Sequence, residues 1–388
     1  MIAPTPFFSN RGTHIRIFEE VKALVRRGYT LHIITYHLGE NPFHDSNIRV
    51  HRVPALLFWY RKTEAGVSWQ KIILDILIIL QGTWKALRLR PDIIDAHHHE
   101  GVLIGWCITR LLFWRSIRLI GDFHSSLADE MASDGYLSWP PLFRFFRWLE
   151  RMTSRLPDEA IASSTTYTGA LQKMRRGRPT HYVPDGVGGA RSLDNSDSSA
   201  HERFHLPRGK VLIVYAGGFQ ENKGILTLLD AFGIASRKRS DIHLVLAGSP
   251  ALSIKAHLAS RPEFRETVTL VSPLSYHDVP ALLGACDIGV DPKEPLVGQA
   301  SGKILQYMGA GLPIVCYDTP QNREYLGDGG LIVRERSPEK LAEALLALAN
   351  DPEKRRQMRK ESLSRSRTFS WQHTAETIER IYHDVSRT

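Results

Sequence analysis

Short apolar segments alternate with helical segments along most of this chain, and the series occurs twice. In the first half, a helix with Ile17, Val21 and Leu24 on one face ends near Gly28 and separates two apolar segments. Strands that are separated by helices usually pair in parallel, with helices on both faces of the sheet. The pattern therefore predicts a doubly wound α/β sheet, whose strands we expect at residues 2–3, 31–35, 92–96, 117–120 and 160–162.

A polar segment over residues 188–203 interrupts this alternation, and a second series follows it. The chain has 388 residues, whereas a single hydrophobic core rarely serves more than about 250–300. We therefore expect a second Rossmann-like domain with strands at 211–215, 244–247, 288–290 and 313–316. Ligands of such sheets bind at the carboxyl ends of the strands, so the two domains should face a central cleft. The predicted boundaries are 1–190 for the N-terminal domain, 191–204 for a linker, 205–370 for the C-terminal domain and 371–388 for a helix that packs back toward the N-terminal domain.

The composition excludes several other classes of protein. Hydrophobic residues make up 43% of the chain, which excludes wholesale disorder, and no apolar run reaches about 18 residues without a charge, which argues against a membrane span. The start lacks the pattern of a signal peptide, although Ile2 and Ala3 look like the end of a strand whose beginning would lie upstream. Cys107, Cys286 and Cys316 are scattered among apolar residues, so we expect buried thiols in the reducing cytoplasm.

The clearest local motif runs from Tyr215 to Gly224, directly after a predicted strand and at the start of a helix. Its paired glycines, Gly217 and Gly218, let a ligand approach the backbone, and Lys223 adds a cation beside the helix N-terminus. This combination suits a pyrophosphate. The Lys-Gly order is not that of a Walker A loop, and no GxGxxG follows any strand, which weakens a dehydrogenase interpretation. The alternative is a plain glycine turn with a solvated lysine.

A second motif begins with Ser301, Gly302 and Lys303 and continues through a helix to Gly311-Leu312-Pro313. Free amides at a helix N-terminus stabilise a nearby anion. Two such termini with Lys223 and Lys303 could hold a diphosphate without a metal ion. The alternative is an ordinary capped core helix.

In order and spacing, these motifs resemble the donor-binding half of GT-B glycosyltransferases, in particular the retaining glycosyltransferase family 4, also described as glycosyl transferases group 1. The resemblance extends over about residues 2–385. It implies the GT-B fold and transfer of a sugar from a UDP- or GDP-sugar, with retention at the anomeric carbon, to a glycan, a lipid-linked or another acceptor. Further matching segments are Pro4-Thr5-Pro6 with Gly12, Arg27-Gly28-Tyr29, residues 91–97, Val183 to Val187, Leu246-Ala247-Gly248 and residues 306–315.

The resemblance also implies roles for individual residues. Lys223 and the loop at Gly12 would bind the diphosphate, Gln306 would hold the ribose, and His124 would lie near the reacting centre. The site predicted in this way has His124 and Lys223 as catalytic residues, and its donor-binding residues are Gly12, Gly217, Gly218, Lys223, Glu294, Ser301, Gly302, Lys303 and Gln306. No cofactor and no metal are expected, because the nucleotide sugar is a substrate.

Three positions depart from the family pattern. Gln306 replaces the ribose-binding glutamate, and Gly298 stands where the family has an earlier glutamate that touches the donor sugar. Glu294 is the nearby acid that could substitute for it, and Gly218 replaces an arginine often found before the Lys-Gly pair. These departures motivate an alternative, a catalytically lapsed relative that binds nucleotide sugars. A nucleotide-sugar epimerase of similar architecture is a further alternative.

Two histidine segments precede the linker. A metal site at His97-His98-His99-Glu100 is not expected, because consecutive strand residues point to opposite faces. Asp122 and His124 are two residues apart and could share one face of a strand, either in the cleft or as a hydrogen-bonded structural pair.

Charge and aromatic residues are concentrated in the first half. The net charge is +9, of which residues 1–190 supply +7 (24 Lys and Arg against 17 Asp and Glu), and seven of the eight tryptophans lie there. No RRM, KH or helix-turn-helix signature accompanies the pI near 9.4, so nucleic acid is not an expected partner.

The helix at residues 141–152 combines both features. We expect a core stripe with an opposite cationic face, either solvated or in contact with an anionic membrane or a lipid-pyrophosphate acceptor, which would place the protein at the inner membrane face. The loop at residues 56–62 adds aromatics beside cations. The predicted stripe is Leu142, Phe145, Phe146, Leu149 and Met152, and the cationic face is Arg144, Arg147, Arg151 and Arg155.

Overall fold

The computed structural model describes residues 1–9, 12–61, 68–188, 198–293 and 300–387. Among these, residues 1–185, 300 and 371–387 form one compact unit, and residues 186–293 and 301–370 form a second. Each unit has its own hydrophobic core around its own parallel sheet. We refer to them as unit 1 and unit 2.

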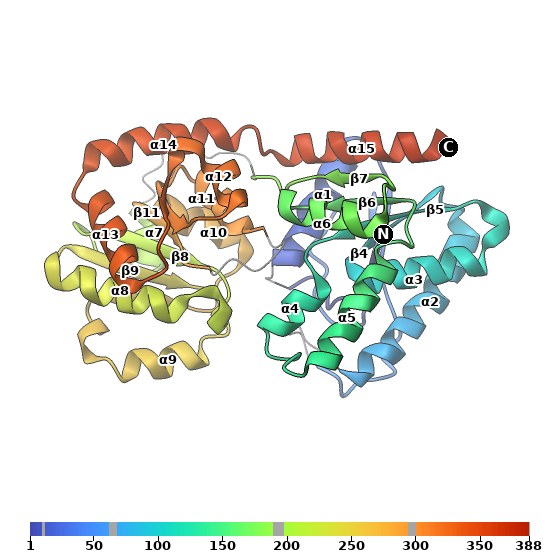
Figure 1. Ribbon diagram of the computed structural model, residues 1–388, viewed down its shortest axis with the longest axis horizontal. Coiled ribbons are helices and arrows are strands. Elements are labelled where there is room, and N and C mark those ends of the chain that lie inside the picture. Colours follow the sequence, from blue (N-terminus) through green and yellow to red (C-terminus); the bar gives the residue numbers. More distant parts are fainter. Residues whose placement is uncertain (10–11, 62–67, 189–197, 294–299, 388) are drawn as a thin grey trace. The chain divides into compact units, whose positions relative to one another are not determined.

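Unit 1 is a doubly wound α/β unit (Figure 1). Its strand order is β3-β2-β1-β4-β5-β6-β7, and every pairing between the described strands is parallel. The order reverses between β1 and β4, the position at which such sheets bind ligands. The strands are β1 (Ile2–Ala3), β2 (Leu31–Thr35), β3 (Ile48–Arg52), β4 (Ile93–His97), β5 (Arg118–Phe123), β6 (Glu159–Ala162) and β7 (Thr180–Tyr182). The helices are α1 (Gly12–Arg26), α2 (Trp69–Leu89), α3 (His98–Leu111), η1 (Phe113–Arg115), α4 (Leu127–Ser133), α5 (Pro140–Thr153), α6 (Thr165–Arg175) and α15 (Trp371–Arg387).

Unit 2 repeats the plan with the strand order β10-β9-β8-β11-β12-β13, again parallel throughout the described part. Here the order reverses between β8 and β11. The strands are β8 (Val211–Ala216), β9 (Ile242–Ala247), β10 (Val268–Val271), β11 (Ile288–Asp291), β12 (Ile314–Tyr317) and β13 (Gly330–Val333). The helices are α7 (Ser198–Arg203), η2 (Glu221–Lys223), α8 (Ile225–Lys238), α9 (Leu252–Ala259), η3 (Pro262–Phe264), η4 (Tyr276–Asp278), α10 (Val279–Gly284), α11 (Gly302–Gly309), α12 (Pro320–Leu326), η5 (Gly327–Gly329), α13 (Pro338–Ala349) and α14 (Pro352–Ser366).

The C-terminal helix α15 belongs to unit 1, although unit 2 precedes it in the chain. It packs against α1, where Arg27 forms ion pairs with Glu376 and Glu379. Its Tyr382 hydroxyl donates a 2.5 Å hydrogen bond to the buried carboxylate of Asp95 on β4. The helix is therefore attached to unit 1 by a buried polar contact as well as by apolar packing.

Within the segment predicted as a linker, the described residues belong to unit 2. Residues 198–203 form α7, and Ala200 and Phe204 are buried in unit 2. The polar composition of the segment did not indicate this short helix. Cys286 and Cys316 are buried as expected, whereas Cys107 is half-buried, and all three are free thiols. None of the described helices is long and apolar enough to cross a membrane.

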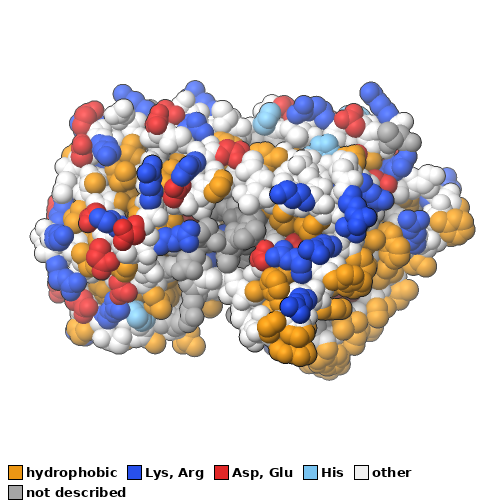
Figure 2. Space-filling model, viewed as in Figure 1, with side chains coloured by type: hydrophobic (Ala, Val, Ile, Leu, Met, Phe, Trp, Pro, Cys, Tyr) orange, Lys and Arg blue, Asp and Glu red, His pale blue; other side chains and the backbone are white. Residues whose placement is uncertain are grey.

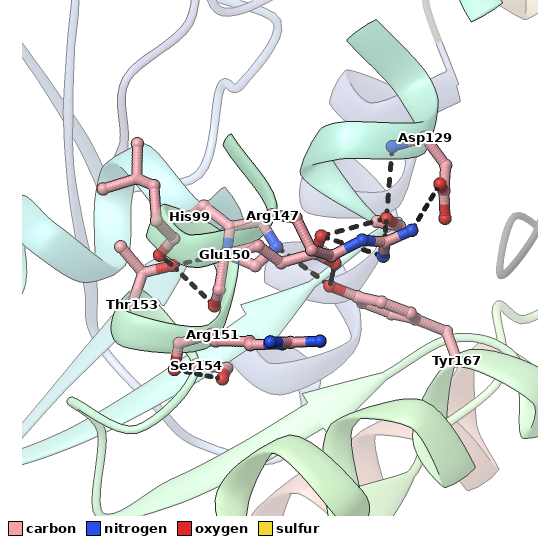
Figure 3. A network of polar contacts seen from close by, with 10 residues as sticks. His99, Asp129, Arg147, Glu150, Arg151, Thr153, Ser154 and Tyr167 are labelled. Atoms are coloured by element: carbon pink, nitrogen blue, oxygen red, sulfur yellow. Dashed lines mark hydrogen bonds and ion pairs between the residues drawn. The ribbon is translucent and has the colours of Figure 1, made fainter. Parts of the chain in front are cut away.

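The core stripe predicted for the helix at 141–152 is found only in part. In α5, Leu142, Phe146, Leu149 and Met152 are half-buried and Phe145 is exposed, whereas the fully buried residues are Glu150 and Thr153. The physical reason is a polar network on the inner side of the helix. Glu150 accepts a 2.8 Å hydrogen bond from the Tyr167 hydroxyl and forms an ion pair with Arg147 (Figure 3). Arg147 is therefore not part of a free cationic face. Arg155 lies beyond the end of the helix and donates to the carbonyl of Met174.

Candidate functional site

The glycine turn of unit 2 follows β8 at the point where the strand order reverses. Two of the glycines around it are required by the backbone. Gly224, the N-cap of α8, has φ +74°, and a Cβ there would lie 2.1 Å from the carbonyl oxygen of Pro292. A Cβ at Gly248, which follows β9, would lie 1.8 Å from the carbonyl oxygen of Gly217. The turn is thus packed tightly against the ends of the neighbouring strands.

A lysine from the second motif lies directly over this turn. The Nζ of Lys303 donates a 3.1 Å hydrogen bond to the hydroxyl of Tyr215, and it also lies 4.2 Å from the centroid of that ring. A Cβ placed on Gly217 would be 3.1 Å from Cε and 3.3 Å from Nζ of Lys303. The Tyr215 hydroxyl in turn donates to the carbonyl of Gly218 at 2.7 Å. The structure therefore brings the two sequence motifs into one cluster.

A buried carboxylate completes the cluster. Asp291, the last residue of β11, lies 3.1 Å from Nζ of Lys303 and accepts a 2.5 Å hydrogen bond from the hydroxyl of Ser301. Burial by itself disfavours both charges, but Asp291 outweighs it and raises the pKa of Lys303. Burial likewise opposes the charge of Asp291, but Lys303 and Ser301 lower its pKa. Both groups are therefore ionised at neutral pH, and the lysine is a fixed, oriented cation.

The less buried side of helix α11 carries residues that the sequence analysis predicted to bind the donor. Ile304, Leu305, Tyr307 and Met308 are buried, whereas Gly302, Lys303 and Gln306 are half-buried and share one face by the i, i+3, i+4 spacing. The Tyr307 hydroxyl, on the buried side, accepts a 2.7 Å hydrogen bond from the amide of Ala216 at the end of β8. This hydrogen bond thus joins α11 to the start of the glycine turn on the buried side of the helix.

Lys223 closes the one-turn helix η2 and immediately precedes Gly224. Its side chain is half-buried, and its backbone amide donates to the carbonyl of Gln220 at 3.0 Å. Lys223 is therefore held at the N-terminus of α8, where the prediction placed it.

In unit 1, a buried ion-pair network lies at the carboxyl end of the sheet. The guanidinium of Arg16, on α1, is 3.0 Å from Asp122 at the end of β5 and 2.5 Å from Asp185. Arg16 and Asp122 are 2% and 0% exposed. Burial opposes the charge of Arg16, but the two carboxylates outweigh it and raise its pKa. The network ties α1 to Asp122, which lies 106 positions from Arg16 along the chain, and to Asp185, which lies 169 positions from it.

His124 lies next to this network. Its Nε2 is 3.3 Å from Nδ1 of His97 and 4.0 Å from Asp122, and its ring stacks on His98 with centroids 4.3 Å apart. Burial, reinforced by the neighbouring His98 and by Arg16, holds the pKa of His124 well below its usual range. His124 is therefore a neutral imidazole at physiological pH, able to exchange hydrogen bonds but carrying no charge.

Gly12 is the first residue of α1 and is exposed. A Cβ there would meet nothing within 4 Å, so packing does not require a glycine at this position. The structure also places Glu20, which the sequence analysis did not single out, near Asp95 and Asp122. It is buried, and burial together with those two carboxylates raises its pKa well above the usual range.

The cluster of His97, Asp122 and His124 has the donor atoms of a three-ligand metal site. However, Arg16 already neutralises Asp122 at 3.0 Å, and a second cation at the same carboxylate would be repelled by the guanidinium. The donor set is therefore a poor one for a divalent ion.

The structure thus brings together Gly217, Gly218, Ser301 and Lys303 in unit 2, with Gln306 on the same helix face. It places His124 beside Asp122 in unit 1, while Glu294 lies outside the described residues. The sequence analysis missed Asp291 and Arg16. The signal for Asp291 was available, since a lone carboxylate ends an apolar strand, but its partner could not be identified from spacing.

Comparisons with known proteins cover both units. The model of "Glycosyltransferase Family 4" matches residues 11–188, and that of "Glycosyl transferases group 1" matches residues 210–351. A D-inositol 3-phosphate glycosyltransferase from Corynebacterium aurimucosum is 24% identical over 96% of this chain and 91% of its own length. One from Corynebacterium glutamicum is also 24% identical, but the match spans 50% of this chain and only 48% of that enzyme.

Solved structures share the fold over nearly the whole chain. A sucrose-phosphate synthase from Thermosynechococcus elongatus has a TM-score of 0.80 at 16% identity and covers 99% of this chain and 98% of its own. Anabaena HepE, solved in complex with UDP and glucose, has a TM-score of 0.75 at 15% identity and covers 98% of both chains. These neighbours establish the GT-B fold for this chain.

Proposed function

Because the chain belongs to the glycosyltransferases through both of its domains, we propose that it moves a sugar from a nucleoside-diphosphate sugar to an acceptor hydroxyl, with retention at the anomeric carbon. The observation that carries this proposal is the cluster in unit 2, in which the Lys303 ammonium lies directly over the glycine turn. It is so close that a Cβ added to Gly217 would be 3.3 Å from Nζ. A glycine turn, a helix N-terminus and an oriented cation coincide at the switch point of a doubly wound sheet. That combination favours a diphosphate.

The chemistry of the donor explains why such a cluster suffices for catalysis. When the glycosidic bond to the diphosphate breaks, negative charge develops on the leaving phosphate. Cations and amides held in place before the reaction stabilise that charge without reorganisation. Lys303, fixed by Tyr215 and Asp291, and Lys223 at the start of α8 fit this task. For retention, the leaving phosphate accepts the proton of the acceptor on the same face of the sugar.

The neutral state of His124 fits a role in positioning the donor sugar. A neutral imidazole can hydrogen-bond a sugar hydroxyl, whereas an imidazolium would repel the positive charge that develops on the sugar ring. We propose no metal cofactor, since lysines and helix N-termini supply the positive charge. Addition of EDTA should leave the rate unchanged, and a loss of activity that Mg²⁺ or Mn²⁺ restores would contradict this part of the proposal.

The test is a calorimetric titration with UDP, GDP and ADP, followed by assay of the corresponding donor sugars. Lys223→Ala should weaken binding of the diphosphate by at least tenfold and reduce transfer further, because the lysine contacts charge in both the ground state and the transition state. The matched control is Lys255→Ala on α9, an exposed lysine of the same unit. An unchanged affinity in the Lys223 variant would refute the assignment of the site.

Binding without turnover would instead favour the lapsed relative that Gln306 and Gly298 suggested. The stereochemistry is tested separately by NMR of the fresh product. An anomeric centre inverted relative to the donor would refute retention while leaving the donor site intact.

A further inference from the structure

The tryptophans of unit 1 are unusually exposed. Of the eight in the chain, all of them within the described residues, six are between 45% and 64% exposed. Tryptophan is normally buried on average, and its exposure is typical of surfaces that meet a partner or a membrane interface. The six are Trp59, Trp69, Trp84, Trp114, Trp139 and Trp148.

The helix α2 is apolar on two opposite faces. Its inward face is buried in the core of unit 1 through residues four apart, Leu74, Ile78, Gly82 and Ala86. A second apolar stripe at helical spacing faces outward. It consists of Trp69, Ile72, Ile76, Leu80, Trp84 and Leu87, all of which are exposed. A helix at an ordinary aqueous surface carries polar residues on that side.

Neighbouring elements continue this surface. α3 packs against both α2 and α5, and it exposes Leu103 and Leu111. The short helix η1 follows α3 and exposes Phe113 and Trp114. In α5, Glu150 and Thr153 are buried in the network of Figure 3, whereas Phe145 and Trp148 are exposed. Figure 2 shows the hydrophobic side chains gathered on the part of unit 1 where Figure 1 has α2 and α5.

On α2 and α5, the acidic side chains are turned inward, whereas the exposed charged side chains are basic. The acids are held inward: Asp75 of α2 accepts a 2.7 Å hydrogen bond from Tyr36, and Glu150 of α5 is fully buried. The exposed charged residues of α2 and α5, both described throughout, are Arg88, Arg144 and Arg151. Arg88 lies over the ring of Trp84 at 4.0 Å. The outer surface therefore offers aromatics and aliphatics beside cations.

We propose that this surface, formed by α2, η1, α5 and the exposed residues of α3, docks unit 1 onto an anionic phospholipid bilayer. Apolar side chains with cations beside them bind at the headgroup boundary of such membranes, without crossing them. A second copy of the chain fits less well, because a two-fold contact through the same patch would bring like-charged arginines together. The proposal rests on the proposed function in one respect, that the acceptor would then lie in or at the membrane.

The test is flotation of the full chain with vesicles of phosphatidylcholine containing phosphatidylglycerol, compared with phosphatidylcholine alone. The wild type should float with the anionic vesicles at low salt, and less so as salt increases. Its tryptophan emission should shift to the blue on binding. Replacing Arg88, Arg144 and Arg151 with Gln should weaken partitioning by about fivefold per cation, or roughly a hundredfold for all three.

The apolar variant is Ile72→Gln with Ile76→Gln and Leu80→Gln, which keeps good helix formers on an already exposed face. Partitioning should fall by roughly tenfold for each side chain that no longer leaves water. The matched control is Leu226→Gln with Leu252→Gln, exposed leucines of unit 2, which should float like the wild type. For the cations, the control is replacement by Gln of Arg334, Arg336 and Lys360, all exposed in unit 2.

Failure of the wild type to float at low salt would overturn the proposal, as would equal flotation of the apolar variant. A dimer in light scattering that the apolar variant converts to a monomer, without flotation of either, would identify a second copy as the occupant and would also overturn it. Flotation needs no donor or turnover, so its outcome is independent of the nucleotide titration that tests the proposed function.

Discussion

Replacing Asp291 with Asn tests the charge pair at the centre of the candidate donor site. The substitution keeps the shape of the side chain and an oxygen that can accept from Ser301, but it removes the charge that faces Lys303 at 3.1 Å. Breaking a fully buried ion pair costs roughly 3–5 kcal/mol. Lys303 is 13% exposed and keeps its contact with Tyr215, so we expect a loss of about 2–3 kcal/mol.

For a unit of this size, that loss corresponds to a decrease of about 5–10 °C in the midpoint of its thermal transition. Scanning calorimetry measures the change, and hydrogen exchange of β11 and α11 assigns it to unit 2. The control is Asp278→Asn, which removes a more exposed pair with Arg203 and should cost no more than about 1 kcal/mol.

The pH dependence provides a second readout. Because the pKa of Asp291 is lowered in the folded chain, its contribution to stability is present above the usual carboxyl pKa. That contribution is lost as the pH falls through the lowered value. The difference in stability between wild type and variant should therefore be fully present at pH 7 and should disappear at acidic pH. Equal midpoints at pH 7, or a difference that persists unchanged at low pH, would refute the reasoning.

Three further substitutions test other parts of the structure. Gln306→Glu should bind the nucleotide at least as tightly as the wild type, whereas Gln306→Leu should cost about 1–3 kcal/mol of binding by stranding a ribose hydroxyl; equal titrations of the two would place this residue away from the donor. Arg16→Met should cost roughly 3–5 kcal/mol in urea unfolding because it leaves two carboxylates unpaired, while Arg27→Gln, at a more exposed pair, should change the midpoint far less. Tyr382→Phe should destabilise unit 1 by about 1–3 kcal/mol by depriving Asp95 of its donor, with faster hydrogen exchange in α15; unchanged exchange would show that this hydrogen bond does not hold the helix.

Several features of the chain could be predicted because they depend on neighbours in the sequence. Strand and helix periodicity follow from local alternation, and parallel pairing of the strands follows from the helices between them. The glycine turn could also be located, since paired glycines and a Lys-Gly pair stand between an apolar strand segment and a helical segment. The position of Lys223 at that helix start needs no information from elsewhere in the chain.

The partners of the site residues could not be predicted in the same way. Lys303 and Tyr215 are 88 positions apart, and Arg16 and Asp185 are 169 apart. Each of these side chains carries a charge or a hydroxyl that could pair with many others. Only the folding of each sheet brings one particular partner into contact.

The helix α5 shows the same division. Its sequence determined that residues near 141–152 would be helical and amphipathic, and that prediction was confirmed. Amphipathicity alone does not say which side faces inward. The tertiary structure decided this by placing Tyr167 and His99 where Glu150 and Thr153 could satisfy them. A buried polar group without a partner costs more than an exposed phenylalanine, so Glu150 and Thr153 took the fully buried positions, whereas Phe145 is exposed and the rest of the predicted stripe is half-buried.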